Sequence, residues 1–343
     1  MKNDAIEKEA NELVLDMEHL TVHFELEDET VYAVNDVSLK IEKGKTIGLV
    51  GETGAGKTTT ALAILQLIPD PPGVIKDGRI CVCGQDMRQM STKQLEKIRG
   101  QDVSMIFQDP MTSLNPVFTV GQQIAESVEL HENMNKEEAW ERACKMLELV
   151  GIPRARANDY PHQFSGGMKQ RVVIAIALAC NPKLLIADEP TTALDVTIQA
   201  QVLDLMGRLK EKYGTAMIMI THDLGIVAEI CDEVAVMYAG RIVERGTLEE
   251  IFDHTKHPYT EGLFNSLPNI NDRKAELTPI PGLMPDPSHL PQGCAFAPRC
   301  PYATSVCEEQ PPTLHRFSDT HETLCSAYDR AGFRINRKEY TDG

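Results

Sequence analysis

The sequence contains no hydrophobic run long enough to cross a membrane. Its longest apolar stretch, residues 172–180, covers about half of the roughly 20 residues that a spanning helix needs. Residues 1–8 contain no apolar run either, so the chain shows no secretory signal. We therefore expect a cytoplasmic protein that reaches a membrane only through a partner.

The chain is also short of positive charge. It has 34 basic and 51 acidic residues, and its formal net charge is −17. A balance of this kind argues against nucleic acid as a partner of the whole chain. The 343 residues, of which 42% are hydrophobic and 25% charged, suit a globular protein of about two domains with a sizeable core.

One segment carries a motif of known chemistry, Gly-x-x-x-x-Gly-Lys-Thr at residues 51–58. It follows an apolar run at residues 46–50, typical of a buried strand, and precedes a helix-forming run at residues 59–65. Backbone N–H groups of such a loop bind phosphate oxygens, Lys57 would reach the β- and γ-phosphates, and the Thr58 hydroxyl would bind Mg²⁺. The alternative is a glycine-rich turn with one exposed lysine. The candidate nucleotide-binding residues here are Gly51, Glu52, Thr53, Gly54, Ala55, Gly56, Lys57, Thr58 and Thr59.

Strand-like alternation precedes this loop. Residues 13–24 alternate apolar and polar side chains, and two shorter strands are predicted near residues 31–34 and 37–41. An antiparallel layer is therefore expected before the nucleotide-binding sheet. Phe24 ends the first strand and could stack on an adenine ring or belong to the core, and Tyr32 is the alternative stacking residue.

Two adjacent carboxylates end a second buried strand. Residues 184–187 form a continuous apolar run after Lys183, which suits the centre of a parallel sheet, and Asp188 and Glu189 follow it. Asp188 can hold Mg²⁺ through water, and Glu189 can orient or deprotonate an attacking water. The alternative is that the pair caps a helix.

Polar residues also follow two other predicted strands. Gln108 comes after the strand at residues 102–107, where it can hydrogen-bond a metal ion or an attacking water. His222 comes after the strand at residues 216–221, where it could sense a γ-phosphate. Taken singly, each is also compatible with a structural role.

Helical periodicity marks an insertion at about residues 112–170. It ends at Ser165, Gly166 and Gly167, which precede a very apolar helix. Ser165 is a natural N-cap, and the two glycines expose the first N–H groups of that helix. An anion site or a simply capped helix are both possible there.

The composition changes after residue 257. Eleven of the twenty prolines lie between residues 258 and 312, which predicts a separate and irregular module. We therefore divide the chain into an N-terminal tail (1–12), a nucleotide-binding domain (13–257) and a C-terminal extension (258–343).

The order of these motifs resembles that of ATP-binding-cassette (ABC) ATPases over residues 13–257. The resemblance implies an α/β fold with a RecA-like parallel sheet, an antiparallel β subdomain and a helical insertion. In this family's terms Gln108 is the Q-loop residue, residues 164–168 are the signature, Asp188 is the Walker B aspartate, Glu189 is the catalytic base, Asp195 belongs to the D-loop and His222 is the switch histidine. The usual signature is Leu-Ser-Gly-Gly-Gln, whereas this chain has Phe164 and Met168 at its ends.

Three segments sharpen the resemblance to the ATPase subunits of oligopeptide and dipeptide importers, namely residues 105–116, 160–168 and 294–301. It implies ATP hydrolysis at the cytoplasmic face of the cell membrane. The implied partners are a second ATPase subunit (a copy of this chain or a related one), two transmembrane permease subunits and an extracytoplasmic peptide-binding protein. Because the signature helix lies too far along the fold to reach its own phosphate loop, Ser165, Gly166 and Gly167 are expected to serve the site of that second subunit.

Alternative functions differ in what they require. Nickel or other small-solute importers belong to the same branch and usually have a shorter tail. Soluble cassette ATPases of DNA repair or ribosome work usually carry two cassettes, a coiled-coil insert or basic surfaces. A purely regulatory nucleotide-binding module would not need Glu189 and His222, and both are present.

Nine cysteines in a cytoplasmic chain are not expected to form disulfides. Five are scattered and are interpreted as small core residues: Cys81, Cys83, Cys144, Cys180 and Cys231. The other four, Cys294, Cys300, Cys307 and Cys325, have the spacing C-x₅-C-x₆-C-x₁₇-C, wider than the paired spacing of a zinc ribbon. Thiolates in an irregular segment suggest a bound metal or cluster. Zinc and unligated structural thiols are the alternatives to a cluster. The family resemblance points to a 4Fe–4S cluster.

Overall fold

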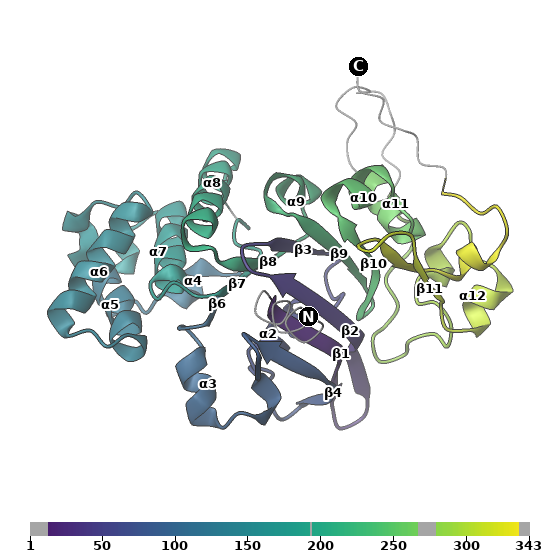
Figure 1. Ribbon diagram of the computed structural model, residues 1–343, viewed down its shortest axis with the longest axis horizontal. Coiled ribbons are helices and arrows are strands. Elements are labelled where there is room, and N and C mark those ends of the chain that lie inside the picture. The colour runs from purple at the N-terminus through teal and green to yellow at the C-terminus, as the bar shows by residue number, and fades with distance from the viewer. Residues whose placement is uncertain (1–12, 193, 267–278, 336–343) are drawn as a thin grey trace, which may run out of the picture.

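The computed structural model describes residues 13–192, 194–266 and 279–335, and the predicted N-terminal tail lies outside these residues. Two β-sheets occupy the middle of the molecule (Figure 1). A group of helices lies on one side of them, and the C-terminal extension lies on the other. The two sheets supply the frame on which the candidate site is built.

The larger sheet has eight strands in the order β11-β12-β10-β9-β3-β8-β7-β6. Its central strands are parallel, and every residue of β3, β7 and β8 is buried, as their continuous apolar runs predict. β10, β12 and β11 pair antiparallel at one edge. The strands are β3 (Thr46–Val50), β6 (Val103–Ile106), β7 (Leu184–Asp188), β8 (Ala216–Thr221), β9 (Glu233–Tyr238), β10 (Arg241–Thr247), β11 (Leu314–Arg316) and β12 (Glu322–Leu324).

The smaller sheet is antiparallel, with the order β2-β1-β4-β5. Its strands are β1 (Leu13–Glu25), β2 (Thr30–Glu42), β4 (Gly73–Val82) and β5 (Gln85–Asp86). The sequence predicts two short strands where β2 is continuous. The polar break at Asn35 and Asp36 is a β-bulge rather than a turn, because Asp36 has φ 61° and the register between β1 and β2 shifts at this point.

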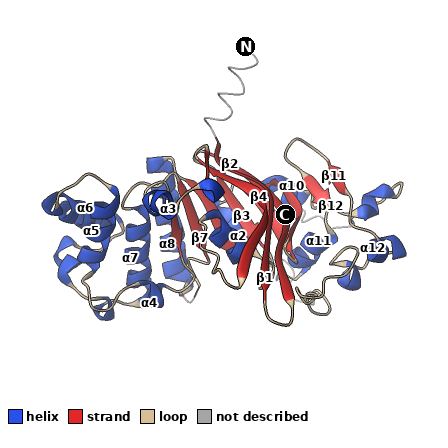
Figure 2. Ribbon diagram, turned by 90° about the horizontal axis from the view of Figure 1, so that it is seen from below, coloured by secondary structure: helices blue, strands red, loops and turns tan. Residues whose placement is uncertain are grey.

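Helices α4, α5, α6 and α7 lie together on one side of the sheets (Figure 2). The predicted insertion, about residues 112–170, contains α5 (Val120–His131) and α6 (Lys136–Leu149). It overlaps the end of α4 (Pro110–Ser113) and the start of α7 (Gly166–Leu178). Capping boxes at Thr119 and Asn135 begin α5 and α6, and the Ser165 hydroxyl accepts from the N–H of Met168 at the start of α7, which confirms the predicted N-cap. The remaining helices are α2 (Lys57–Ile64), α3 (Thr92–Ile98), α8 (Val196–Tyr213), α9 (Leu224–Ile230), α10 (Leu248–Asp253), α11 (Pro258–Asn265) and α12 (Ser305–Glu309).

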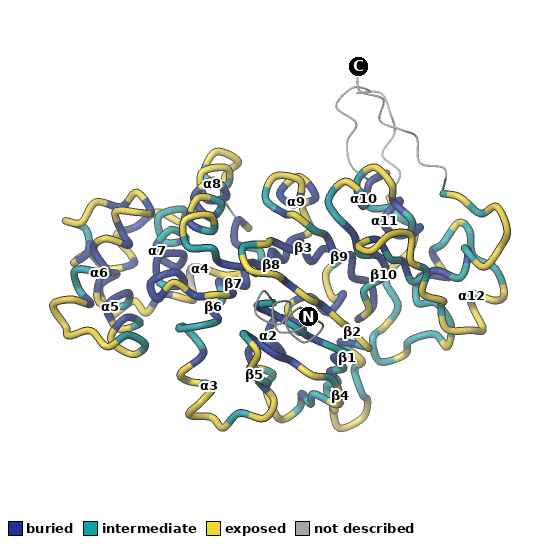
Figure 3. Tube along the Cα trace, viewed as in Figure 1, coloured by how far each residue is buried: buried dark blue, intermediate teal, exposed yellow. Residues whose placement is uncertain are grey.

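Two hydrophobic clusters cover the two faces of the larger sheet. Alternate residues of β7 enter different clusters, since Leu185 and Ala187 pack with the helical insertion while Leu184 and Ile186 pack with the small sheet and α2. Buried segments accordingly run through the middle of the molecule (Figure 3). The central strands are therefore held rigidly from both sides, which positions the residues at their ends.

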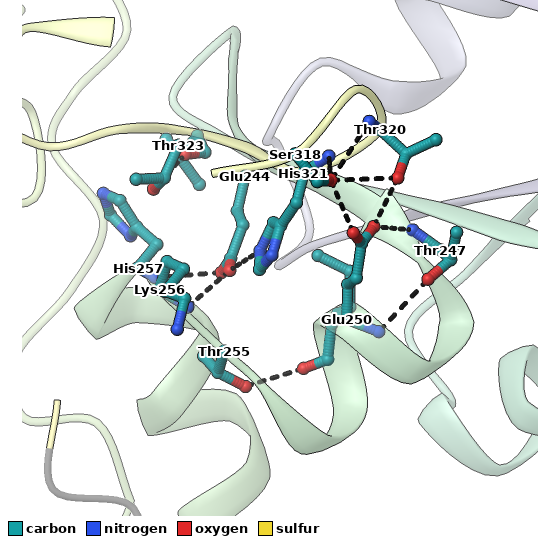
Figure 4. Close-up of polar contacts among 12 residues, drawn as sticks. Glu244, Thr247, Glu250, Thr255, Lys256, His257, Ser318, Thr320, His321 and Thr323 are labelled. Atoms are coloured by element: carbon teal, nitrogen blue, oxygen red, sulfur yellow. Dashed lines mark hydrogen bonds and ion pairs between the residues drawn. The ribbon is translucent and has the colours of Figure 1, made fainter. Parts of the chain in front are cut away.

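The C-terminal extension continues the larger sheet, because β12 pairs with β10. Glu244 of β10 is fully buried, and its carboxylate accepts hydrogen bonds from the N–H groups of Lys256 and His257 and from Nε2 of His321 (Figure 4). The sequence predicts a separate module at this point. β11 and β12 have only three residues each, too few for a periodic signal, and only their pairing with β10 identifies them as strands.

A second carboxylate holds the hairpin formed by β11 and β12. Glu250 of α10 accepts from the hydroxyls of Ser318 and Thr320 at 2.6 and 2.8 Å (Figure 4). Partial burial raises the pKa of Glu250, but the hydrogen bonds from Ser318, Thr247 and Thr320 outweigh this effect and lower the pKa to about 2. The carboxylate is therefore charged at neutral pH and keeps the loop between β11 and β12 against the nucleotide-binding domain.

Candidate active site

The phosphate loop joins β3 to α2. Gly56 has φ 102°, and a Cβ at this position would lie 2.4 Å from the carbonyl oxygen of Ala33. Gly51 is equally constrained, since its Cβ would lie 2.1 Å from the carbonyl oxygen of Met237. Only glycine fits at these two positions, so the loop packs tightly on the strands beneath it.

Lys57 is the first residue of α2, and its side chain is buried inside the loop. Its Nζ donates to the carbonyl oxygens of Gly51 and Glu52 at 2.8 and 2.9 Å. Burial lowers the pKa of Lys57, and the nearby carboxylates of Glu189, Asp188 and Glu52 oppose this shift. The ammonium group is thus held at the centre of the loop.

Asp188 is the last residue of β7 and is almost fully buried. Its Oδ2 accepts from the hydroxyl of Thr58 at 2.8 Å. Burial raises the pKa of Asp188, while the Thr58 hydrogen bond and the charge of Lys57 act in the opposite direction. The paired hydroxyl and carboxylate oxygens are the hard ligands that Mg²⁺ prefers, so these residues fit such an ion.

Glu189 follows β7 with a left-handed φ of 45°. Its carboxylate accepts from Gln108 Nε2 at 2.8 Å, from the Thr192 hydroxyl at 2.9 Å and from His222 Nδ1 at 3.0 Å. Burial raises the pKa of Glu189, but these hydrogen bonds outweigh burial, and the pKa lies below its ordinary value. Glu189 is therefore an ionised group, oriented by residues that follow two neighbouring strands.

The candidate site is a pocket of about 470 Å³. It brings together eleven of the predicted site residues: Phe24, Thr53, Gly54, Gly56, Lys57, Thr58, Thr59, Gln108, Asp188, Glu189 and His222. Tyr32, the alternative stacking residue, lines a neighbouring cavity instead. Three residues of the pocket were not predicted from the sequence, namely Val31, Ala33 and Pro287. Pro287 belongs to the extension, and its sequence carries no signal of this placement.

The other predicted nucleotide-binding residues do not line this pocket. Gly51 and Ala55 are buried, and Glu52 is half-buried. Ser165, Gly166 and Gly167 begin α7, and Ser165 and Gly166 are exposed to solvent. Asp195 caps α8 by accepting from the N–H of Ile198 at 2.9 Å.

The four cysteines of the extension line one small cavity, together with His257, Phe296 and Tyr302. The N–H of Cys294 donates to the carbonyl oxygen of Cys307 at 2.7 Å, which holds these two segments together. Burial raises the pKa of Cys300 to about 11 and that of Cys325 to about 12. Within the described residues, however, no three histidine, cysteine, aspartate or glutamate side chains form a group that could hold a metal ion.

Comparison with known proteins identifies the family. The ABC transporter family model matches residues 34–192, and the model of the oligopeptide/dipeptide transporter C-terminal region matches residues 243–307. The chain is 53% identical over 311 residues to the oligopeptide transport ATP-binding protein OppD of Bacillus subtilis (strain 168), covering 90% of this chain and 87% of that one. The chain belongs to the oligopeptide/dipeptide branch of the ABC transporter ATPases.

Other members of this branch match over similar lengths. The dipeptide transport ATP-binding protein DppD of Bacillus subtilis (strain 168) is 49% identical over 321 residues, which cover 93% of this chain and 96% of DppD. Among solved structures, a dimeric post-hydrolysis state of the ATP-binding cassette MJ0796, bound to ADP and Pi, matches with a TM-score of 0.62 and 27% identity. It covers 68% of this chain and 98% of that cassette. These findings confirm the predicted α/β ABC fold.

Across the described residues, no helix combines the length and the apolar character that a membrane span requires.

Proposed function

We propose that the chain binds and hydrolyses ATP to energise the import of oligopeptides or dipeptides through a membrane complex. The observation that carries this proposal is the similarity to relatives named for oligopeptide and dipeptide transport, which extends through the C-terminal extension. The pocket supports the ATPase part, because its acidic, amide and imidazole groups meet beside the phosphate loop.

Each group in the pocket has a proposed role. Lys57 binds the β- and γ-phosphates, and Thr58, Asp188 and Gln108 hold Mg²⁺. When bound, Mg²⁺ neutralises phosphate charge. Glu189 accepts the proton of the attacking water, and His222 orients Glu189 through the hydrogen bond between Nδ1 and Oε1.

Two such chains, or this chain and a related one, form the working ATPase in this proposal. Ser165 and Gly166 are exposed and lie outside the pocket of their own chain, which suits residues that complete the site of a neighbour. Gly167 and Asp195 belong to the same proposed surface. The solved cassette MJ0796, bound to ADP and Pi, is itself dimeric.

We place the complex at the cytoplasmic face of the membrane, with two permease subunits and an extracytoplasmic peptide-binding protein as further partners. The helical insertion offers the permeases a surface. Val117 and Phe118, between α4 and α5, are 70% and 47% exposed, and they follow the segment that begins at Gln108. Apolar side chains exposed in this way are typical of a protein contact.

Peptide uptake tests the proposal. Deletion of the gene from its own host is expected to abolish uptake of a radiolabelled oligopeptide or dipeptide, and the intact gene should restore it. A pull-down from detergent-solubilised membranes should recover two hydrophobic subunits and a second cassette. Unchanged peptide uptake with loss of nickel uptake would instead assign the chain to nickel import, and recovery of soluble partners alone would assign it a role outside transport.

We also propose that Cys294, Cys300, Cys307 and Cys325 bind a 4Fe–4S cluster. The support is that all four side chains face one cavity inside a module with little core of its own. A cluster spaces its four thiolates more widely than a single ion spaces its ligands, so a site for a cluster differs from a site for one zinc ion.

Cys300→Ser is expected to lose most of the bound iron, because a thiolate ligand is removed. Iron, acid-labile sulfide and the visible absorption band would be measured in the anaerobically purified full chain. Cys144→Ser is the matched control, since Cys144 is a buried cysteine of the helical insertion and should leave the iron content unchanged. Stoichiometric zinc in the unaltered protein, or no metal at all, would contradict the cluster.

A further inference from the structure

The C-terminal extension makes direct contact with the phosphate loop. Arg299 lies between Cys294 and Cys300, and its side chain is only 6% exposed. Its Nη1 donates to both carboxylate oxygens of Glu52, at 3.0 and 3.1 Å. Glu52 is the second residue of the loop, so residues 247 positions apart in the sequence are joined by a charged pair.

The position of Arg299 is set by its other contacts. Its Nε donates to the carbonyl oxygen of Pro281 at 2.9 Å, and its Nη1 also lies 3.3 Å from the hydroxyl of Tyr238. The guanidinium carbon lies 5.8 Å from the ring centre of Tyr238 and 6.0 Å from that of Phe296. A guanidinium held at several points in this way presents its N–H groups to Glu52 in one fixed orientation.

Glu52 is held a second time through its backbone. Its N–H donates to the hydroxyl of Tyr259 at 2.9 Å. Tyr259 is fully buried on α11, and its ring packs against those of Tyr238 and Phe296 at 4.6 and 5.4 Å. The carbonyl oxygen of Glu52 in turn accepts from Lys57 Nζ. Glu52 therefore links the contacts of the extension to the buried lysine.

We propose that Arg299 and Tyr259 are positioning residues of the ATP site, which act through Glu52 to hold the phosphate loop in its binding conformation. Neither residue lines the nucleotide pocket. Three glycines of the loop have positive φ, and glycine backbone can adopt more conformations than that of other residues, so contacts from outside the loop help to keep it in one conformation. The extension therefore sets the ATP affinity of the domain, which goes beyond the ATPase function proposed above and does not depend on the metal.

The experiment measures ATP binding by calorimetry to the full chain in a Glu189→Gln background, so that hydrolysis does not interfere. Arg299→Ala is expected to weaken ATP binding by about tenfold, because the loop loses an external constraint. Arg299→Lys keeps the charge without the multiple contacts, so its ATP affinity should lie between that of Arg299→Ala and that of the chain with Arg299 intact. Tyr259→Phe should weaken binding by about threefold, since it removes only one hydrogen bond.

A double-mutant cycle with Glu52→Ala separates positioning from general stability. If Arg299 acts through Glu52, the double variant binds ATP no more weakly than the worse of the two single variants. Additive losses would overturn the proposal, and so would unchanged ATP affinity in Arg299→Ala. If Arg299→Ala does not fold, Tyr259→Phe and Glu52→Gln carry the test, and unchanged affinity in both would overturn it.

Two matched controls lie in the same extension. Arg330 donates to the carbonyl oxygen of Tyr302 and lies over the ring of Phe333, so Arg330→Ala removes similar contacts away from the phosphate loop. The hydroxyl of Tyr328 donates to the carbonyl oxygen of Lys256. Tyr328→Phe removes this hydrogen bond and changes the side chain by one oxygen atom only. Both controls should retain full ATP affinity. A loss equal to that of Arg299→Ala would show that any disturbance of the extension weakens binding, and would overturn the assignment to Arg299.

Discussion

Replacement of Glu189 by glutamine is expected to reduce ATP hydrolysis by about 10² to 10⁴-fold while ATP binding persists. The amide keeps the size of the side chain but cannot accept a proton from the attacking water. The lowered pKa of Glu189 means that the carboxylate is already ionised at neutral pH, as a general base must be. Phosphate release and ATP affinity would be measured on the same preparation of the assembled complex.

The control for this variant is Glu249→Gln, an exposed glutamate on α10 that lies outside the pocket. It should hydrolyse ATP at the unaltered rate. Unchanged turnover in Glu189→Gln would contradict the role of Glu189 as the base. Loss of both binding and turnover would also contradict it, because Glu189 would then be needed to shape the pocket rather than to accept a proton.

Lys57→Ala is expected to weaken ATP binding by roughly 10 to 100-fold, the equivalent of one charge-assisted contact in a buried site. The substitution removes the only lysine that lines the described pocket. It also releases the carbonyl oxygens of Gly51 and Glu52, which Nζ now holds at 2.8 and 2.9 Å. Equilibrium titration of the full chain with ATP would measure the loss.

Lys183→Ala provides the comparison. Lys183 pairs with Asp102 at 2.9 Å, near the amino ends of the parallel strands and away from the phosphate loop. Its removal should leave ATP affinity unchanged. Normal affinity in Lys57→Ala would rule out the interpretation of residues 51–58 as a phosphate loop.

The grouping of the candidate catalytic residues was predictable because of strand topology. Gln108, Asp188, Glu189 and His222 follow apolar runs that suit parallel strands, and the carboxyl ends of parallel strands meet at one edge of a sheet. The strand order β3-β8-β7-β6 places these ends beside one another. Hydrogen-bond partners within the group, such as Gln108 and His222 to Glu189, did not follow from the sequence, because they depend on side-chain orientation.

The contribution of the extension was not predictable. Pro287 enters the nucleotide pocket and Arg299 reaches Glu52, yet each lies in a segment without helical or strand periodicity. Such contacts arise from packing between distant parts of the chain, and no local pattern encodes them. The hairpin of β11 and β12 was missed for the same reason.

Motif chemistry and periodicity by themselves predicted the candidate ATP site and determined the family, since each motif consists of residues that lie close together in the sequence. Only the tertiary structure decided that Phe24 rather than Tyr32 lines the pocket and that the extension continues the larger sheet. The phosphate loop illustrates the difference. Its glycines and lysine are set by local backbone geometry and charge, whereas the residues that hold it in place, Tyr259 and Arg299, come from a segment more than 200 residues away.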